Sequence, residues 1–256
     1  MKNTAPAPEL QLSVKRSRPE DQTRGLIAKD KESDLEQAAD PTLTEDLALA
    51  LLARNTLSVE AIEELSKNAN LSSTRKVRVG MVIHPRTPRR ISLKLLRQLH
   101  TFDLMRIALL PVMSGDLKRV AAELLVSRLA SITLGERISL ARRAAETVAA
   151  ALLLDKEPRV LQAALENPRL TEAAIVKVLA RPGATTALVQ AVCRHGKWSP
   201  RQEIRLALLR HPKTPLAHAL VFAHSMPPAL VRDILHGSQV SEKVKSYLRK
   251  ELDLKV

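Results

Sequence analysis

The same six-residue phrase occurs twice in this chain, as IHPRTP at residues 83–88 and as RHPKTP at residues 210–215. Proline cannot continue a helix and moves the preceding residue out of the helical region, so the His-Pro pair ends a helix. At such an end a charged histidine interacts favourably with the last carbonyls. A threonine before a second proline is typical of a helix start. The phrase therefore predicts a tight turn between two helices, with Thr87 and Thr214 as N-caps.

The similarity extends beyond the phrase. KVRVGMVIHPRTP at 76–88 aligns with EIRLALLRHPKTP at 203–215 at a constant offset of 127 residues. Upstream, NTLSVEAI at 55–62 aligns with NPRLTEAAI at 167–175, out of step with the first match by about fourteen residues, the length of one helix and a turn. Internal self-similarity built from helix pairs is typical of a solenoid.

Helix-ending signals recur at short intervals in the C-terminal half. They fall at Asn167-Pro168, Arg181-Pro182, His195-Gly196 and His211-Pro212, at intervals of 14, 14 and 16 residues. A helix of about ten or eleven residues plus a short loop fills each interval. We expect about fifteen short helices, from residues 44–54 to residues 241–252, with the longest over residues 115–132.

Composition agrees with an all-α fold. Of the 256 residues, 45% are apolar, only four are aromatic and seven are glycine. Helix-forming Ala, Leu, Glu, Arg and Lys are abundant, and no alternating run of convincing length predicts a strand. We therefore predict a right-handed α-solenoid, which is a superhelical stack of short antiparallel helices.

The chain divides into two parts by composition. Residues 1–40 are polar, charged and poor in aromatic side chains, and we expect them to form a disordered N-terminal tail. Residues 41–256 are expected to form the helical repeat domain, with the internal duplication over about 55–100 and 167–225. The chain has one cysteine, no apolar run typical of a signal peptide and no membrane span, so we expect a cytoplasmic protein.

One stretch, residues 134–180, carries the pattern of a known repeat type. The form D-x-x-P-x-V-x-x-A-L-x-x-N-P-x-L is matched by Asp155, Pro158, Val160, Ala164, Leu165, Asn167, Pro168 and Leu170. The chain thus resembles bacterial α-helical repeat proteins of the HEAT-like and leucine-rich-repeat-variant type over residues 41–236. The resemblance implies a curved stack of helices, a fold that serves scaffolds, nucleic-acid binders and a few enzymes. Some variant-repeat proteins hold an iron–sulfur cluster, but a single cysteine cannot supply four thiolates.

No motif of a catalytic, metal or cofactor site stands out. His211, His218 and His224 are the closest group of histidines, but their spacings do not place two imidazoles on one helical face. Cys193 is more typical of a small buried hydrophobe than of a nucleophile. HEAT-like DNA glycosylases share the architecture but need aromatic faces for bases, and packing at a helix start explains Trp198. We therefore expect no enzyme, no cofactor, no metal and no small-molecule substrate.

Positive charge is the strongest functional clue. The net charge is +14, and no acid occurs between Glu64 and Asp103, a run with nine Lys or Arg residues. From Ala173 to Arg232 there are again nine, with Glu203 as the one acid. Such a surface favours an anionic partner, namely an acidic protein, DNA or RNA. The alternative is that the basic side chains only keep the protein soluble.

The predicted function is a non-enzymatic scaffold with a basic surface for a macromolecular partner, which we expect to be an acidic or helical protein. Sequence-nonspecific binding to the backbone of duplex DNA is the alternative, since it needs Lys and Arg but no stacking aromatics. A continuous basic face would favour nucleic acid, and scattered charges beside an apolar groove would favour a protein. The predicted partner-binding residues are Arg75, Arg78, Arg86, Arg89, Arg90, Arg201, Arg205, Arg210 and Lys213.

Overall fold

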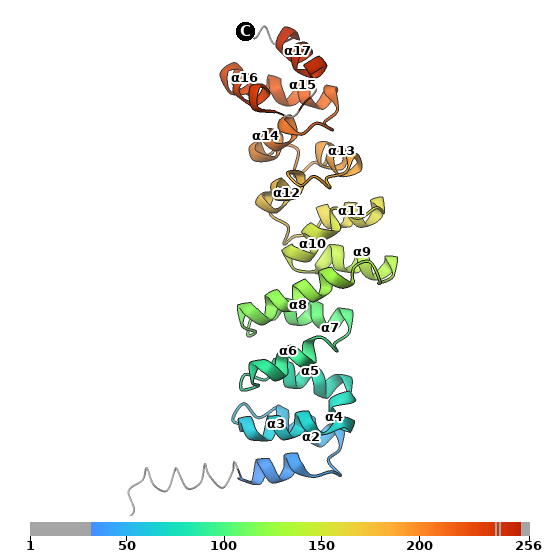
Figure 1. Cartoon of the computed structure of the whole chain (residues 1–256), viewed down its shortest axis with the longest axis vertical. Coiled ribbons are helices and arrows are strands. Elements are labelled where there is room, and N and C mark those ends of the chain that lie inside the picture. The colour runs from blue at the N-terminus through green and yellow to red at the C-terminus, as the bar shows by residue number, and fades with distance from the viewer. Residues whose placement is uncertain (1–31, 239, 241, 252–256) are drawn as a thin grey trace, which may run out of the picture. The chain divides into compact units, whose positions relative to one another are not determined.

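The computed structural model describes residues 32–238, 240 and 242–251, and every regular element within them is an α-helix (Figure 1). The all-α class predicted from composition is thereby confirmed. A helix over residues 32–39 precedes sixteen further helices. Their bounds are α2 Glu45–Leu52, α3 Val59–Lys67, α4 Ala69–Ser73, α5 Arg75–Ile83, α6 Arg89–Leu96, α7 Thr101–Leu109, α8 Gly115–Arg128, α9 Leu134–Arg143, α10 Glu146–Leu152, α11 Pro158–Leu165, α12 Glu172–Leu179, α13 Thr186–Arg194, α14 Gln202–Arg210, α15 Leu216–His224, α16 Pro228–Gly237 and α17 Glu242–Glu251. Among these helices, none has the length and apolar character needed to cross a bilayer.

The chain forms two compact units, unit 1 up to Ser92 and unit 2 from Leu93. In unit 1, α2 packs on α5, and α4 packs on both α3 and α5. In unit 2, helices from α8 onward form two rows in which a helix contacts the second helix along the chain. One row runs through α8, α10, α12, α14 and α16, and we call it the even row. The other runs through α9, α11 and α13, and Figure 1 shows the two rows side by side.

Each short helix buries one apolar stripe. Helix α12 buries Ile175, Val178 and Leu179, and α14 buries Ile204 and Leu208, at the spacings of one helical face. These helices have eight and nine residues, shorter than predicted, because the turns take up more of each interval. Helices of this length are unstable alone, so packing between neighbours stabilises them. As predicted, α8 is the longest described helix, with 14 residues, although it ends at residue 128.

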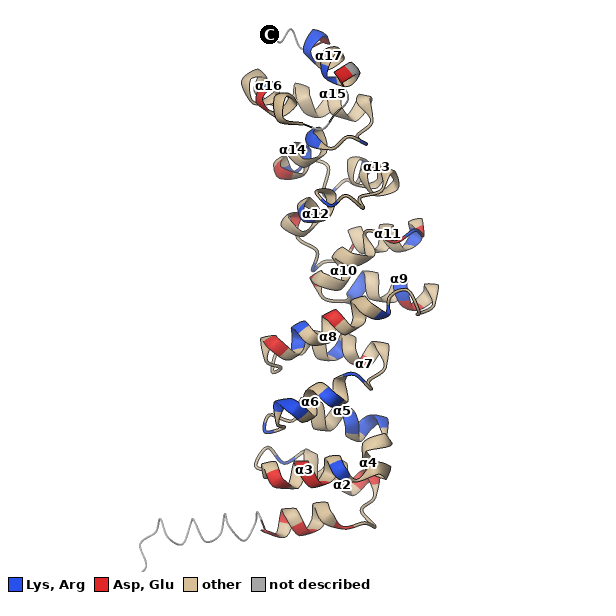
Figure 2. Cartoon of the chain, in the orientation of Figure 1, with Lys and Arg blue, Asp and Glu red and all other residues tan. Residues whose placement is uncertain are grey.

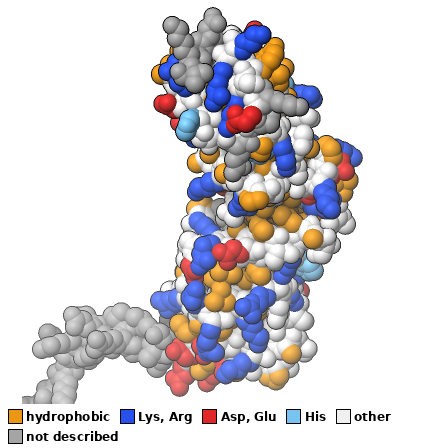
Figure 3. Space-filling model, turned by 45° about the horizontal axis from the view of Figure 1, so that its top comes forward, with side chains coloured by type: hydrophobic (Ala, Val, Ile, Leu, Met, Phe, Trp, Pro, Cys, Tyr) orange, Lys and Arg blue, Asp and Glu red, His pale blue; other side chains and the backbone are white. Residues whose placement is uncertain are grey.

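In unit 1, most acidic residues lie on earlier helices than most basic residues. Figure 2 shows acidic residues on the helix over 32–39 and on α2 and α3, and basic residues on α5 and α6. Ion pairs join the two groups, including Lys76 with Glu45 at 3.6 Å and Arg90 with Glu63 at 2.6 Å. On the face shown in Figure 3, Lys and Arg side chains are interspersed with hydrophobic and neutral ones. The acid-free run is therefore partly balanced by acids that precede it in the chain.

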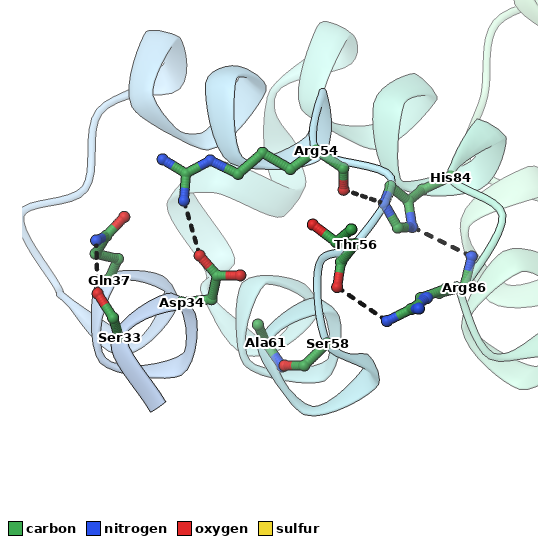
Figure 4. A network of polar contacts seen from close by, with 9 residues as sticks. All are labelled: Ser33, Asp34, Gln37, Arg54, Thr56, Ser58, Ala61, His84 and Arg86. Carbon is green, nitrogen blue, oxygen red and sulfur yellow. Dashed lines mark hydrogen bonds and ion pairs between the residues drawn. The ribbon is translucent and has the colours of Figure 1, made fainter. Parts of the chain in front are cut away.

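Part of the segment predicted as an N-terminal tail, residues 1–40, is helical. Residues 1–31 of that segment lie outside the described residues, but residues 32–39 form a helix that buries Asp34 and Ala38. The guanidinium of Arg54 donates to Asp34 at 2.8 Å (Figure 4). Composition could not reveal this contact, because the partner that holds the helix lies twenty residues further along the chain.

The repeated phrase forms the same turn in both copies, but its threonine is not an N-cap. Thr87 Oγ1 donates to the carbonyl of Met81 at 2.5 Å, and Thr214 Oγ1 donates to that of Leu208 at 2.6 Å. The helix after the second copy has Pro215 as its N-cap, with no side-chain hydrogen bond. Both threonines therefore satisfy a carbonyl of the preceding helix. The N-cap prediction failed because the last carbonyls of a helix also lack intrahelical partners, and the hydroxyl reaches these instead.

Replacing Thr87 or Thr214 with alanine is expected to lower the free energy of unfolding by about 1 kcal/mol, because a helix-end carbonyl loses one hydrogen-bond donor. Serine keeps the hydroxyl, so both serine variants should stay within about 0.5 kcal/mol of the wild type. Urea unfolding of the four variants measures the difference. Equal losses in the alanine and serine variants would show that the hydroxyl contributes nothing.

Candidate functional site

In four turns the first residue accepts a hydrogen bond from the amide two residues later. In three turns the acceptor is an imidazole Nδ1, and in a fourth it is an amide oxygen. The pairs are His84 with Arg86 at 3.2 Å, His195 with Lys197 at 3.2 Å, His211 with Lys213 at 3.1 Å, and Asn167 with Arg169 at 2.8 Å. An imidazole that accepts at Nδ1 is neutral, with its proton on Nε2. At these helix ends the imidazole rings therefore act as acceptors that shape the turn.

Other polar atoms near these turns contact carbonyls at the end of an earlier helix. The contacts are His84 Nε2 with Arg54 O at 3.0 Å, Asn167 Nδ2 with Ala141 O at 2.7 Å and Ala144 O at 3.2 Å, and Trp198 Nε1 with Leu165 O at 2.8 Å. Figure 4 shows the first of them, with Arg86 reaching the carbonyl of Thr56 beside it. Such carbonyls have no intrahelical partner, so each contact joins a turn to a helix that precedes it by about one helix pair.

Most of the predicted partner-binding residues make contacts inside the protein. Four of them donate to backbone carbonyls, namely Arg78 to Ser72, Arg205 to Ser199, Arg86 to Thr56 and Lys213 to Ala184. Two more form ion pairs, Arg90 with Glu63 and Arg201 with Glu172. The contacts of the two copies correspond, since Arg78 and Arg205 each reach six residues back. The repetition of basic positions in the sequence thus partly reflects the hydrogen bonds of the fold.

The nine predicted residues are divided between the two units, five in unit 1 and four in unit 2. Arg75 and Arg89 are exposed at the starts of α5 and α6. Arg210 is exposed in the last turn of α14, and within the described residues its guanidinium makes no hydrogen bond or ion pair. Arg210 is therefore the predicted residue in unit 2 whose guanidinium is most available to a partner.

Two hollows, each with a volume of 480 Å³, adjoin on the even row of unit 2. The first, which we call the alanine hollow, lies over α8, α10 and α12 and is lined by Val126, Ala150, Ala151, Ala173, Ala174 and Lys177, among others. The second, the basic hollow, lies at the ends of α12 and α14 and is lined by Arg181, Ala184, Ala207, Arg210, His211 and Lys213, among others. Arg181 lines both, which places the two hollows next to each other.

Basic side chains outnumber acidic ones in the lining of both hollows. No carboxylate lines the basic hollow, and the guanidinium of Arg181, like that of Arg210, is exposed without a hydrogen bond or ion pair among the described residues. Lys213 adds a third cation, although its Nζ donates to Ala184 O at 2.6 Å. In the alanine hollow the carboxylate of Glu146 accepts the hydroxyl of Thr171. Together these charges favour a negatively charged group at the basic hollow.

Arg181 was not among the residues predicted from the sequence. The signal was present, because Arg181 and Lys177 lie in the acid-free stretch that begins after Glu172. Both residues lie between the two aligned stretches, 167–175 and 203–215, so the alignment of the copies did not draw attention to them. Their accessibility depends on the way α12 packs between α10 and α14, which no local pattern encodes.

The single cysteine of the chain is unreactive as a nucleophile at neutral pH. Cys193 is buried, and burial raises the pKa of its thiol to about 11, so the thiol stays protonated at neutral pH. This agrees with the prediction of a small buried hydrophobe. In the part of the chain that the structure describes, no cluster of His, Cys, Asp and Glu could hold a metal ion.

Burial lowers the pKa of two turn histidines below the usual 6.5. For His195, Glu166 opposes this shift and Lys197 adds to it, while for His211 Lys213 adds to it. The two histidines then bind protons more readily in the unfolded chain than in the folded chain. Their contribution to the free energy of unfolding is therefore complete above pH 6.5 and is lost as the pH drops through that value.

We expect the free energy of unfolding to fall between about pH 7.5 and about pH 5.5, and a His195→Asn, His211→Asn double variant to lose part of this fall. Asparagine keeps an acceptor for the turn amide, as Asn167 shows. Urea midpoints at both pH values measure the change, with the exposed His236→Asn as the matched control. If the double variant shows the same pH dependence as the wild type, His195 and His211 do not cause the loss of stability at low pH.

The chain matches no protein-family model, no curated protein and no solved structure with which we compared it. Its function is therefore argued from its own residues.

Proposed function

We propose that this chain is a non-enzymatic, right-handed α-solenoid scaffold of the HEAT-like or leucine-rich-repeat-variant type, which binds an acidic or helical protein in the cytoplasm. The observation that carries the proposal is the recurrence of one turn, at His84, Asn167, His195 and His211. A repeated turn between short helices that contact their second neighbours is how solenoids are built. Solenoids present extended surfaces to other macromolecules.

The use of the basic side chains supports a protein partner. A nucleic-acid backbone binder needs several accessible cations along a continuous track. Here Arg78, Arg86, Arg205 and Lys213 donate to carbonyls of the chain itself. The accessible cations of the even row lie beside the alanine hollow. This arrangement suits a partner segment that has both carboxylates and apolar side chains.

Binding to the backbone of duplex DNA is the second candidate. Helix α6 favours it, because Arg89, Arg90 and Lys94 are all exposed on that helix within the acid-free run. Arg90 is partly neutralised by Glu63, which reduces the charge available for phosphates.

Titration of a labelled duplex of arbitrary sequence, at several salt concentrations, separates the two candidates. A scaffold with few accessible cations should show weak binding, with a log–log salt slope no steeper than about −2. A slope of about −5 or steeper would mean that five or more phosphates are neutralised, which would overturn the protein-scaffold proposal in favour of DNA.

A further inference from the structure

We propose that the alanine hollow and the basic hollow form one docking track for an amphipathic, acidic segment of a partner protein. The inference rests on the proposed scaffold function, and it adds the location of the site and the chemistry of the partner. The segment would place apolar side chains in the alanine hollow and carboxylates against Arg181 and Arg210.

The geometry of α12 joins the two halves of the track. Lys177 lies in the last turn of α12, Arg181 follows the end of that helix by two residues, and both are exposed. Lys177 lines the alanine hollow, and Arg181 lines both hollows. Helix α12 contacts α10 on one side and α14 on the other, which brings the alanines of α10 and Arg210 of α14 to the two sides of the same helix.

The alanine hollow fits apolar side chains that a partner supplies. Alanine projects only one methyl group, so Ala150, Ala151 and Ala174 form an apolar floor that leaves room above it. The nearby Val126 and Val178 supply further apolar surface. A helix that lays leucine-sized side chains into such a groove buries apolar area on both partners, which is how amphipathic helices bind grooves.

The basic hollow supplies orientation and specificity for acids. Arg181 and Arg210 have no carboxylate partner among the described residues, and a guanidinium binds a carboxylate through two parallel hydrogen bonds. A nucleic acid would satisfy these cations, but its phosphate backbone has no apolar groups to cover the alanine floor. No Phe, Tyr or Trp side chain lines either hollow to stack on a base. The combination of alanine floor and cations therefore favours a peptide over a nucleic acid.

The test uses the full chain and a fluorescein-labelled helical peptide of about 16 residues, with leucine on one face and glutamate beside it. We expect binding by fluorescence anisotropy, weakened about tenfold by an Arg181→Ala, Arg210→Ala double variant and by a peptide with glutamine in place of glutamate. Arg159→Ala is the matched control, because Arg159 is exposed on α11 and lines neither hollow. Circular dichroism establishes that each variant remains folded.

A second pair of variants tests the alanine hollow. Ala173→Glu places a carboxylate at its edge and should weaken binding of the acidic peptide about tenfold. Ala187→Glu is the control, because Ala187 is equally exposed in the first turn of α13 and lies outside both hollows. Equal effects of the two substitutions would overturn the placement of the peptide in the alanine hollow.

Three other outcomes would overturn the track. The peptide could bind the Arg181→Ala, Arg210→Ala variant as tightly as wild type. A labelled duplex could bind more tightly than the peptide and lose affinity in that variant, which would make the hollow a phosphate site. The protein alone could form dimers that the same substitutions dissociate, which would make a second copy the occupant. The peptide could bind the double variant as tightly as wild type while a protein still co-purifies with the chain from its native cells. That result would contradict the docking track but not the scaffold proposal.

Discussion

Replacing Trp198 with alanine is expected to lower the free energy of unfolding by about 4 kcal/mol, because a large buried ring leaves a cavity. The side chain is only 2% exposed, and its Nε1 donates to Leu165 O at 2.8 Å across the turn that begins at His195. Phenylalanine keeps much of the apolar surface but not the donor, so Trp198→Phe should cost about 1 to 2 kcal/mol.

Urea unfolding measures both changes. Tyr247→Ala is the matched control, since Tyr247 is 47% exposed and its loss should change the free energy of unfolding by only about 0.5 kcal/mol. Similar losses of unfolding free energy for Trp198→Ala and Tyr247→Ala would show that the tryptophan does not join its turn to the end of α11.

Replacing Asn167 with aspartate is expected to cost about 3 kcal/mol or more. Asn167 is fully buried, and its Nδ2 donates to the carbonyls of Ala141 and Ala144 while its Oδ1 accepts the amide of Arg169. Aspartate offers no N–H, so an ionised carboxylate would face two carbonyl oxygens in a buried position. The contact that joins this turn to the end of α9 would be lost.

The pH dependence of this variant gives a second readout. Burial beside carbonyls raises the folded-state pKa of the new carboxyl above its unfolded value, so the deficit relative to wild type should shrink as the pH is lowered towards about 4. Asn70→Asp, at an exposed asparagine of α4, is the control and should change stability by only about 0.5 kcal/mol. A deficit that does not change with pH would contradict the role assigned to Asn167.

The helices were predictable because their ends are marked locally. Pro168, Pro182, Gly196 and Pro212 each follow a helix that the structure ends within a few residues. The duplication was also visible, and the matching hydrogen bonds of Arg78 and Arg205 give it a physical basis.

What could not be predicted depends on partners distant in sequence. The acceptor of the Thr87 hydroxyl could not be chosen, since a threonine between two helices can satisfy the end of either one. The helix over 32–39 is held by the ion pair of Asp34 with Arg54. The ammonium group of Lys213 donates a hydrogen bond to a carbonyl 29 residues earlier in the chain. The accessibility of Arg181 follows from the packing of three helices, which the sequence does not state.

Affinity capture of the full chain from its native cells, with and without nuclease, tests the scaffold proposal most directly. We predict that a protein co-purifies in a stoichiometric amount and remains bound after nuclease treatment. Because an acidic partner is expected, its binding should weaken with salt. Release of all co-purifying material by nuclease, with only nucleic acid recovered from the untreated sample, would contradict the account.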